Sequence, residues 1–210
     1  MSEVLPLFPL NTVLFPGIPL PLHVFEHRYR LLVGELVDGP PPRRFGVVAI
    51  RYGLEVGDEE TPVLHEVGCV AELRRVTRHE DGRYDVVTLG GPRFRLGEVD
   101  DALPYLRASV TYLPEEAGPP VPLAPVAAAF AAYAEAAGGS APALPADDPV
   151  LASYIVAASV RLDLPEKQSL LALPDAATRL RTELTMLRRE TALIAAAPRE
   201  ARTEGPFSLN

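Results

Sequence analysis

The chain has 210 residues, which is enough for one sizeable domain or two small subdomains. Its formal net charge is −8 with both halves acidic, so it offers no basic face of the kind that binds nucleic-acid phosphates. We expect no membrane partner either, because proline repeatedly breaks the apolar opening and no uninterrupted apolar run reaches the about 20 residues that a spanning helix needs. The single cysteine, Cys69, rules out an intramolecular disulfide, and a start unlike a signal peptide favours a cytoplasmic protein.

Residues 4–25 are almost continuously apolar, yet proline recurs at positions 6, 9, 16, 19 and 21. So much proline excludes a helix, and it restricts strands to positions whose N–H no neighbouring strand requires. We therefore expect two strands that are buried on both faces, with a kink between them. Apolar residues at helical spacing after Phe25 then predict a helix that ends at Gly39 and the prolines behind it.

Short β-rich runs separated by turn residues follow this opening. The Asp81-Gly82 pair predicts a hairpin that joins residues 65–78 to residues 83–89. We expect Gly90-Gly91-Pro92 to form a second hairpin turn, and Cys69 to be a small buried apolar residue within a strand. Further strands are predicted at residues 45–50, 93–99 and 105–113.

The composition changes from β-rich to proline-rich and then to alanine-rich after residue 114. Asp148 and Pro149 have the residue types that cap and begin a helix. In the last predicted helix, apolar residues repeat at intervals of three and four, as expected within a bundle. The fold class is therefore predicted to be α+β, with a β-rich pseudo-barrel subdomain that carries one helix (1–114), a linker (115–122), a helical bundle subdomain (123–197) and a flexible tail (198–210).

The opening resembles the signature of the Lon substrate-binding domain family, found at the N-terminus of Lon-type ATP-dependent proteases and also alone in small bacterial proteins. The resemblance rests on Leu7-Phe8-Pro9-Leu10, on Leu14-Phe15-Pro16-Gly17, and on residues 20–26 followed by Arg28-Tyr29. It continues in residues 90–95 and in the closing helix, and it implies a stand-alone domain with a binding role rather than a reaction. Residues with a structural role in these motifs are expected to be Pro9, Pro21, Phe25, Glu26, Arg28, Tyr29, Arg93 and Phe94.

The sequence offers weak candidates for catalysis or metal binding. Residues 23–27 read His-Val-Phe-Glu-His, a zinc-protease pattern that requires both histidines on one continuous helix. The prolines hold His23 in extended chain, so the two rings should diverge. A P-loop motif is absent from the sequence, and Lys167 and Ser169 are two residues apart on a predicted helix, where side chains point away from each other. We therefore assign no catalytic residue, cofactor or metal ligand.

Two interactions of the opening can be predicted from its pattern. Glu26 and Arg93 are expected to pair with each other, since polar groups inside such motifs usually satisfy one another. Phe25, at the junction of strand and helix, is expected to fill the core, so that its truncation to alanine would cost about 3–5 kcal/mol.

The function that the resemblance implies is a non-catalytic module for unfolded or extended polypeptide, an adaptor or substrate binder with an ATP-dependent protease as a candidate partner. A small-molecule-binding or enzymatic domain with a pocket between the β-rich and helical halves is the alternative, and a structural protein that forms homo-oligomers is a third. The candidate peptide-binding surface is an apolar segment in which proline and glycine interrupt regular pairing. Large aliphatic residues are more often buried, so packing into the chain's own core competes with this interpretation. The segment comprises Leu14, Phe15, Pro16, Ile18 and Pro19.

Overall fold

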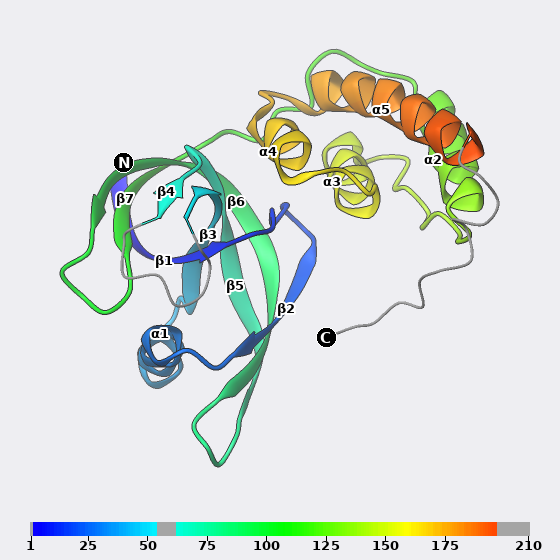
Figure 1. Cartoon of the computed structure of the whole chain (residues 1–210). Coiled ribbons are helices and arrows are strands. Elements are labelled where there is room, and N and C mark those ends of the chain that lie inside the picture. The colour runs from blue at the N-terminus through cyan, green and yellow to red at the C-terminus, as the bar shows by residue number, and fades with distance from the viewer. Residues whose placement is uncertain (1, 54–61, 197–210) are drawn as a thin grey trace.

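A computed structural model of the protein describes residues 2–53 and 62–196. Its N-terminal half is a barrel in which the strands follow the order β1-β7-β6-β5-β3, and a parallel pairing of β1 with β3 closes the circle (Figure 1). The predicted α+β fold with a pseudo-barrel is confirmed. The barrel strands are β1 (Ser2–Leu10), β3 (Arg44–Tyr52), β5 (Val67–Arg78), β6 (Tyr84–Asp100) and β7 (Arg107–Tyr112).

Two further strands lie outside the circle: β2 (Pro19–Val24) pairs with the first half of β6, and β4 (Val63–Leu64) pairs with β3. The helix predicted after Phe25 is α1 (His27–Asp38), which packs on the side of the barrel away from the other helices (Figure 1). Tyr29 of α1 stacks on Phe8 of β1, with ring centroids 3.9 Å apart. Burial on both faces holds for Leu7 to Leu10 of β1, whereas β2 alternates between exposed and partly buried positions up to the buried Val24, so that part of the prediction is wrong.

The predicted hairpin turn at Gly90-Gly91-Pro92 is wrong, because β6 runs through these residues as one long strand. Its first half pairs with β2 and its second half with β7. The glycines allow the loop before β2 to cross closely, since a Cβ on Gly90 would lie 2.0 Å from the carbonyl oxygen of Phe15. Backbone hydrogen bonds fix the crossing, from Gly17 N–H to Gly90 O and from Gly90 N–H to Ile18 O.

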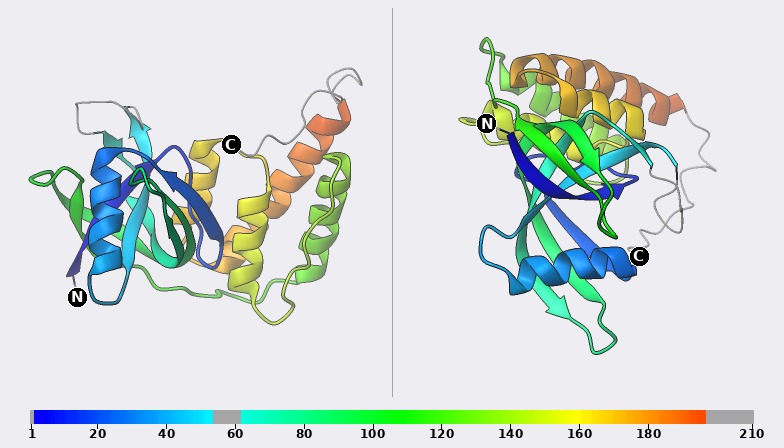
Figure 2. Two further views of the ribbon diagram at one scale, coloured as in Figure 1. Left: turned by 90° about the horizontal axis from the view of Figure 1, so that it is seen from below. Right: turned by 90° about the vertical axis from the view of Figure 1, so that its left-hand side faces the viewer.

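The C-terminal half is a helical bundle beside the barrel (Figure 2). Asp148 caps the second of its helices as predicted, accepting a hydrogen bond from the Leu151 amide. Over the described ranges, no helix is both long enough and apolar enough to cross a membrane. The predicted tail, residues 198–210, lies outside the described residues. The helices are α2 (Leu123–Ala136), α3 (Pro149–Ser159), α4 (Leu164–Ala172) and α5 (Ala176–Ala196).

A buried junction joins the two halves. Phe15 and Val67 from the barrel side contact a cluster that includes Tyr154 of α3 and Leu171 of α4. Arg93 on β6 lies within this junction, only 1% exposed. Its guanidinium donates hydrogen bonds to the carbonyl oxygens of residues 114, 171 and 173, and it forms an ion pair with Glu115 at 2.7 Å.

The predicted pair between Glu26 and Arg93 is therefore wrong. Glu26 instead forms an ion pair with Arg28 at 3.0 Å, just before α1. The physical reason is the placement of the elements, because α1 lies on the opposite side of the barrel from the helices that Arg93 contacts (Figure 2).

Candidate functional site

The outer surface of β2 and β6 presents partly exposed apolar side chains. The antiparallel register places Pro19 opposite Leu89 and Pro21 opposite Val87. Alternation along each strand turns these residues outward, while their neighbours Val86 and Thr88 are buried. Both prolines are exposed and both partners are partly exposed. We call this surface the β2–β6 face, defined by Pro19, Pro21, Val87 and Leu89.

The free edge of β2 is blocked against pairing with another strand. The Gly90 amide donates a hydrogen bond to the carbonyl oxygen of Ile18. Every second residue from Ile18 onward, Leu20 and Leu22, therefore directs its backbone N–H and C=O toward β6. Pro19 and Pro21 are the alternate residues, whose backbone nitrogens face the free edge. Because proline has no N–H, this edge lacks two donors that a further strand would need. An extended ligand would therefore contact this region through side chains on the face rather than by adding a strand.

One end of the β2–β6 face is polar. His23 Nδ1 lies 2.6 Å from one oxygen of Asp85, and His79 Nε2 lies 2.7 Å from the other. The hydrogen bond with His23, and then the one with His79, holds the pKa of Asp85 below its usual range. The zinc-protease pattern is not assembled, because His23 belongs to β2 and His27 begins α1. Among the described residues, no group of three or more His, Cys, Asp or Glu side chains is arranged to hold a metal ion.

The structure corrects the predicted surface at residues 14–19. Leu14 and Phe15 are 3% and 1% exposed, so they cannot form an open binding surface. Phe15 packs against Tyr154 of α3 with ring centroids 6.1 Å apart, and Ile18 packs against the same junction cluster. Pro16 is partly buried, which leaves Pro19 as the exposed member of the segment.

The predicted core position of Phe25 is also wrong, since its side chain is 50% exposed. Tyr29 is buried instead and lies under the Arg28 guanidinium, 4.7 Å from the ring centroid. Phe94 is fully buried, and a Cβ on the facing Gly46 or Gly68 would lie within 2.8 Å of its ring. The two prolines of these motifs also differ in burial: Pro9 is buried in β1, whereas Pro21 is exposed in β2.

A buried polar chain on the helical side was not predicted from the sequence. Arg179 of α5 is fully buried, with Nε donating to Ser153 Oγ and the guanidinium 3.9 Å from the centroid of the Tyr154 ring. Tyr154 in turn donates to Glu115, which also binds Arg93 of the junction. One turn along α5, burial raises the pKa of Glu183 well above its usual range. In the sequence, the only indication of this buried chain is that Arg179 and Glu183 lie next to leucines of the apolar stripe in the last helix.

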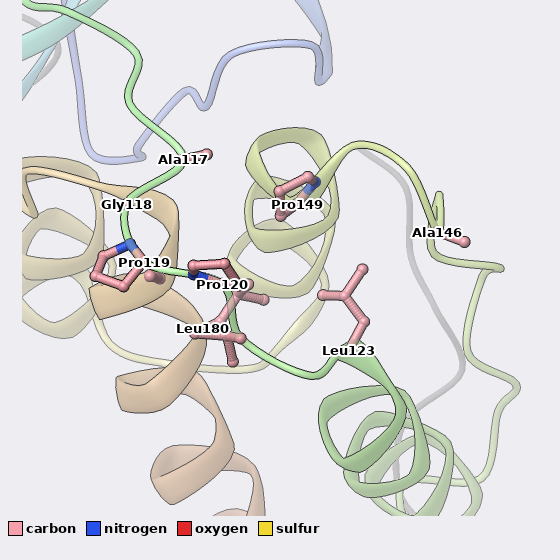
Figure 3. A pocket seen from close by; sticks show the side chains of 10 residues that line it. Ala117, Gly118, Pro119, Pro120, Leu123, Ala146, Pro149 and Leu180 are labelled. Atoms are coloured by element: carbon pink, nitrogen blue, oxygen red, sulfur yellow. The ribbon is translucent and has the colours of Figure 1, made fainter.

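An apolar pocket of about 330 Å³ lies between the linker and the helices (Figure 3). Its lining includes residues 117–121, Leu123 of α2, Pro149 of α3 and Leu180 of α5. The pocket is therefore not between the β-rich and helical halves, where the small-molecule alternative places one. None of its lining residues has a titratable side chain, so the pocket offers no group for acid–base chemistry.

The remaining candidates for catalysis do not form reactive pairs. Ser169 donates its hydroxyl hydrogen bond to the backbone oxygen of Glu166, within its own helix, and burial lowers the pKa of Lys167. Cys69 is fully buried as predicted, and burial raises the pKa of its thiol, which disfavours the reactive thiolate.

Comparison with known proteins places this geometry in context. The model of the ATP-dependent protease La (LON) substrate-binding domain matches residues 4–189. Lon protease 2 of Syntrophobacter fumaroxidans is 30% identical over 188 residues, covering 83% of this chain and 23% of that protease. Lon protease of Flavobacterium johnsoniae is 34% identical over 113 residues, which are 53% of this chain and 14% of the protease. The chain thus spans about a quarter or less of the length of these relatives.

Two solved structures have the same fold. A Lon N-terminal domain protein from Xanthomonas campestris superimposes with a TM-score of 0.67 at 23% identity, covering 93% of this chain and 99% of that one. The N-terminal domain of the Lon protease of the Mycobacterium avium complex gives a TM-score of 0.58 at 16% identity, covering 89% of this chain and 98% of that one.

Proposed function

The chain belongs to the ATP-dependent protease La (LON) substrate-binding domain family, and from this premise we propose that it is a non-catalytic module that binds unfolded or extended polypeptide. The observation that supports a place for this binding is the β2–β6 face. This face presents adjoining apolar groups to solvent on two hydrogen-bonded strands, at Pro19, Pro21, Val87 and Leu89.

The chemistry of this face suits a ligand that lacks a fixed sequence. Apolar contact is not directional, so proline and aliphatic side chains can receive many different apolar residues. The rim supplies polar groups, with His23 and Asp85 at one end and Arg75 in register beside Val87. Because the edge of β2 lacks two N–H donors, the face can bind extended chain without templating a growing sheet.

Delivery of the bound polypeptide to an ATP-dependent protease is part of the same proposal. The support is the likeness of this chain to the N-terminal portion of proteins named as Lon proteases. The enzymatic alternative has less support, because the linker pocket offers no acid–base group and Ser169 is hydrogen-bonded within its own helix.

Val87→Glu tests the binding surface by placing a charge in the centre of the β2–β6 face. The variant should stay folded, because Val87 is partly exposed and Arg75 stands opposite the new carboxylate. We expect it to bind a fluorescently labelled, reduced and carboxymethylated lactalbumin about tenfold more weakly than wild type, as measured by fluorescence anisotropy.

Val4→Glu is the matched control, because Val4 is an outward-facing strand valine, 62% exposed, on β1, where it pairs with β7 and not with β2 or β6. Its affinity should equal that of wild type. Equal affinity of all three proteins, or equal weakening by both substitutions, would refute the assignment of binding to the β2–β6 face.

A further inference from the structure

A groove of about 410 Å³ separates α1 from the projecting β5–β6 hairpin, which lie side by side in Figure 2. One face of α1 lines it, at positions 27, 30, 31, 34, 35 and 38. The hairpin contributes Arg78, Gly82 and Tyr84. Tyr84 is buried while Asp85 is exposed, so the groove lies on the opposite side of β6 from the β2–β6 face.

The charges of α1 in this groove run against its helix dipole. Arg30 lies in the first turn, where a negative charge would be favourable, and Asp38 ends the helix, where a positive charge would be favourable. The first turn of α1 contains no acidic residue and its last turn no basic one. This order weakens the helix, so helix stability does not explain it. Local rules are broken in this way mainly at functional sites.

These charges are also not used in ion pairs within the described structure. No ion pair joins Arg30 or Arg78 to Glu35 or Asp38 in residues 2–53 and 62–196, and the buried Arg30 Nε has no hydrogen-bond partner there. Glu35 accepts a hydrogen bond from the neutral Tyr105 hydroxyl, and no cation of the described residues forms an ion pair with its carboxylate. Other arginines on the same barrel do form ion pairs, at positions 44, 74, 83 and 107.

The centre of the groove is less polar than its ends. Leu31 is 36% exposed, and Tyr84 forms the floor. Gly34 leaves space above this floor, where a Cβ would come into contact with the Tyr84 hydroxyl at 3.4 Å. The groove therefore has Arg30 and Arg78 toward a basic end, with the Arg78 guanidinium 5.8 Å from the centroid of the Tyr84 ring, an apolar strip at Leu31, and an acidic end at Glu35 and Asp38.

We propose that this groove binds an extended polypeptide segment with an acidic and a basic side chain about four residues apart and an apolar residue between them. Eight residues of helix separate Arg30 from Asp38, which is about 12 Å at the helical rise. Extended chain covers that distance in about four residues. The site goes beyond the proposed function, because it selects a charge pattern whereas the β2–β6 face takes apolar residues of any sequence.

A synthetic peptide, Gly-Glu-Ser-Leu-Ser-Lys-Gly with blocked ends, tests the proposal by NMR titration at low salt. The control peptide has lysine in place of glutamate. Wild type should bind the first peptide about fivefold or more tightly than the control, the difference expected from one exposed charge pair. Arg30→Glu should abolish the preference, because the new carboxylate cancels the charge of Arg78 and leaves the basic end without net charge.

Two further variants separate binding from folding. Arg43→Glu makes the same charge change at an exposed arginine outside the groove, and its peptide preference should be that of wild type. Asp38→Lys should weaken binding of the first peptide while raising the melting temperature, because lysine suits the C-terminal end of α1.

The proposal would be overturned by a wild-type protein that binds both peptides equally, or by equal changes in Arg30→Glu and Arg43→Glu. Its failure is distinguishable from failure of the proposed function, because Val87→Glu alters only the β2–β6 face and should leave the peptide preference unchanged.

Discussion

Arg93→Ala should lower the free energy of unfolding by about 3–5 kcal/mol, the range for breaking a buried ion pair by removing one partner. The guanidinium of Arg93 is enclosed at the junction and binds three backbone carbonyl oxygens as well as Glu115. Alanine would remove this donor from the three carbonyl oxygens and leave Glu115 with only the Tyr154 hydroxyl, in a poorly hydrated site. Against a typical total stability of about 5–15 kcal/mol, the loss would be severe.

Arg95→Ala is the matched control for this prediction, because Arg95 lies two residues further along the same strand. Its side chain is 59% exposed and its nearest carboxylate, on Glu66, is 3.5 Å away. The control should change the free energy of unfolding by no more than about 0.5 kcal/mol in urea denaturation. Equal losses for the two variants would show that Arg93 does not hold the halves together.

Phe15→Ala should cost about 3–5 kcal/mol, because it leaves a cavity in the junction between the barrel and α3. The ring of Phe15 is 1% exposed and packs against Tyr154. Phe25→Ala should cost only about 1 kcal/mol or less, since half of that side chain is already in water.

Thermal and urea unfolding of the two alanine variants measure this difference directly. The expected order is opposite to the one that the sequence suggests, where Phe25 is the core residue. A Phe25→Ala variant that unfolds as easily as Phe15→Ala would mean that the strand-to-helix junction is packed differently from the structure described above.

Local patterns in the sequence were enough to predict most elements. The Asp81-Gly82 hairpin, the capping of α3 by Asp148 and the change from extended chain to helix near Phe25 all depend on neighbouring residues. Such signals are contained in a few positions, because turn and cap residues have conformational preferences of their own. The division into a β-rich and a helical half follows from them.

Long-range contacts decided the features that the sequence left open. Phe15 and Phe25 both stand among prolines and apolar residues, and only the partner Tyr154, far along the chain, distinguishes the buried ring from the exposed one. The partners of Arg93 likewise lie far along the chain, beyond residue 113, so the residues around Arg93 do not indicate them. A local pattern of residue types does not encode which distant element will cover it.

Only part of the candidate site could be predicted from the sequence. Pro19 and Pro21 were evident as residues that limit strand pairing, but Val87 and Leu89 join them only through the register of β2 on β6. That register is fixed where the loop before β2 crosses Gly90. The apolar surface therefore depends on tertiary structure, and of the segment predicted at residues 14–19 only Pro19 belongs to it.

Site-specific photocrosslinking tests most directly the central claim that the β2–β6 face receives extended polypeptide. A photoreactive benzoylphenylalanine is placed at position 87 in one protein and at position 4 in another, each with labelled carboxymethylated lactalbumin. We expect an adduct from position 87 that excess unlabelled unfolded polypeptide suppresses and native lactalbumin does not, with little adduct from position 4. Equal adducts from both positions, or none from position 87 while the polypeptide still binds, would contradict the claim.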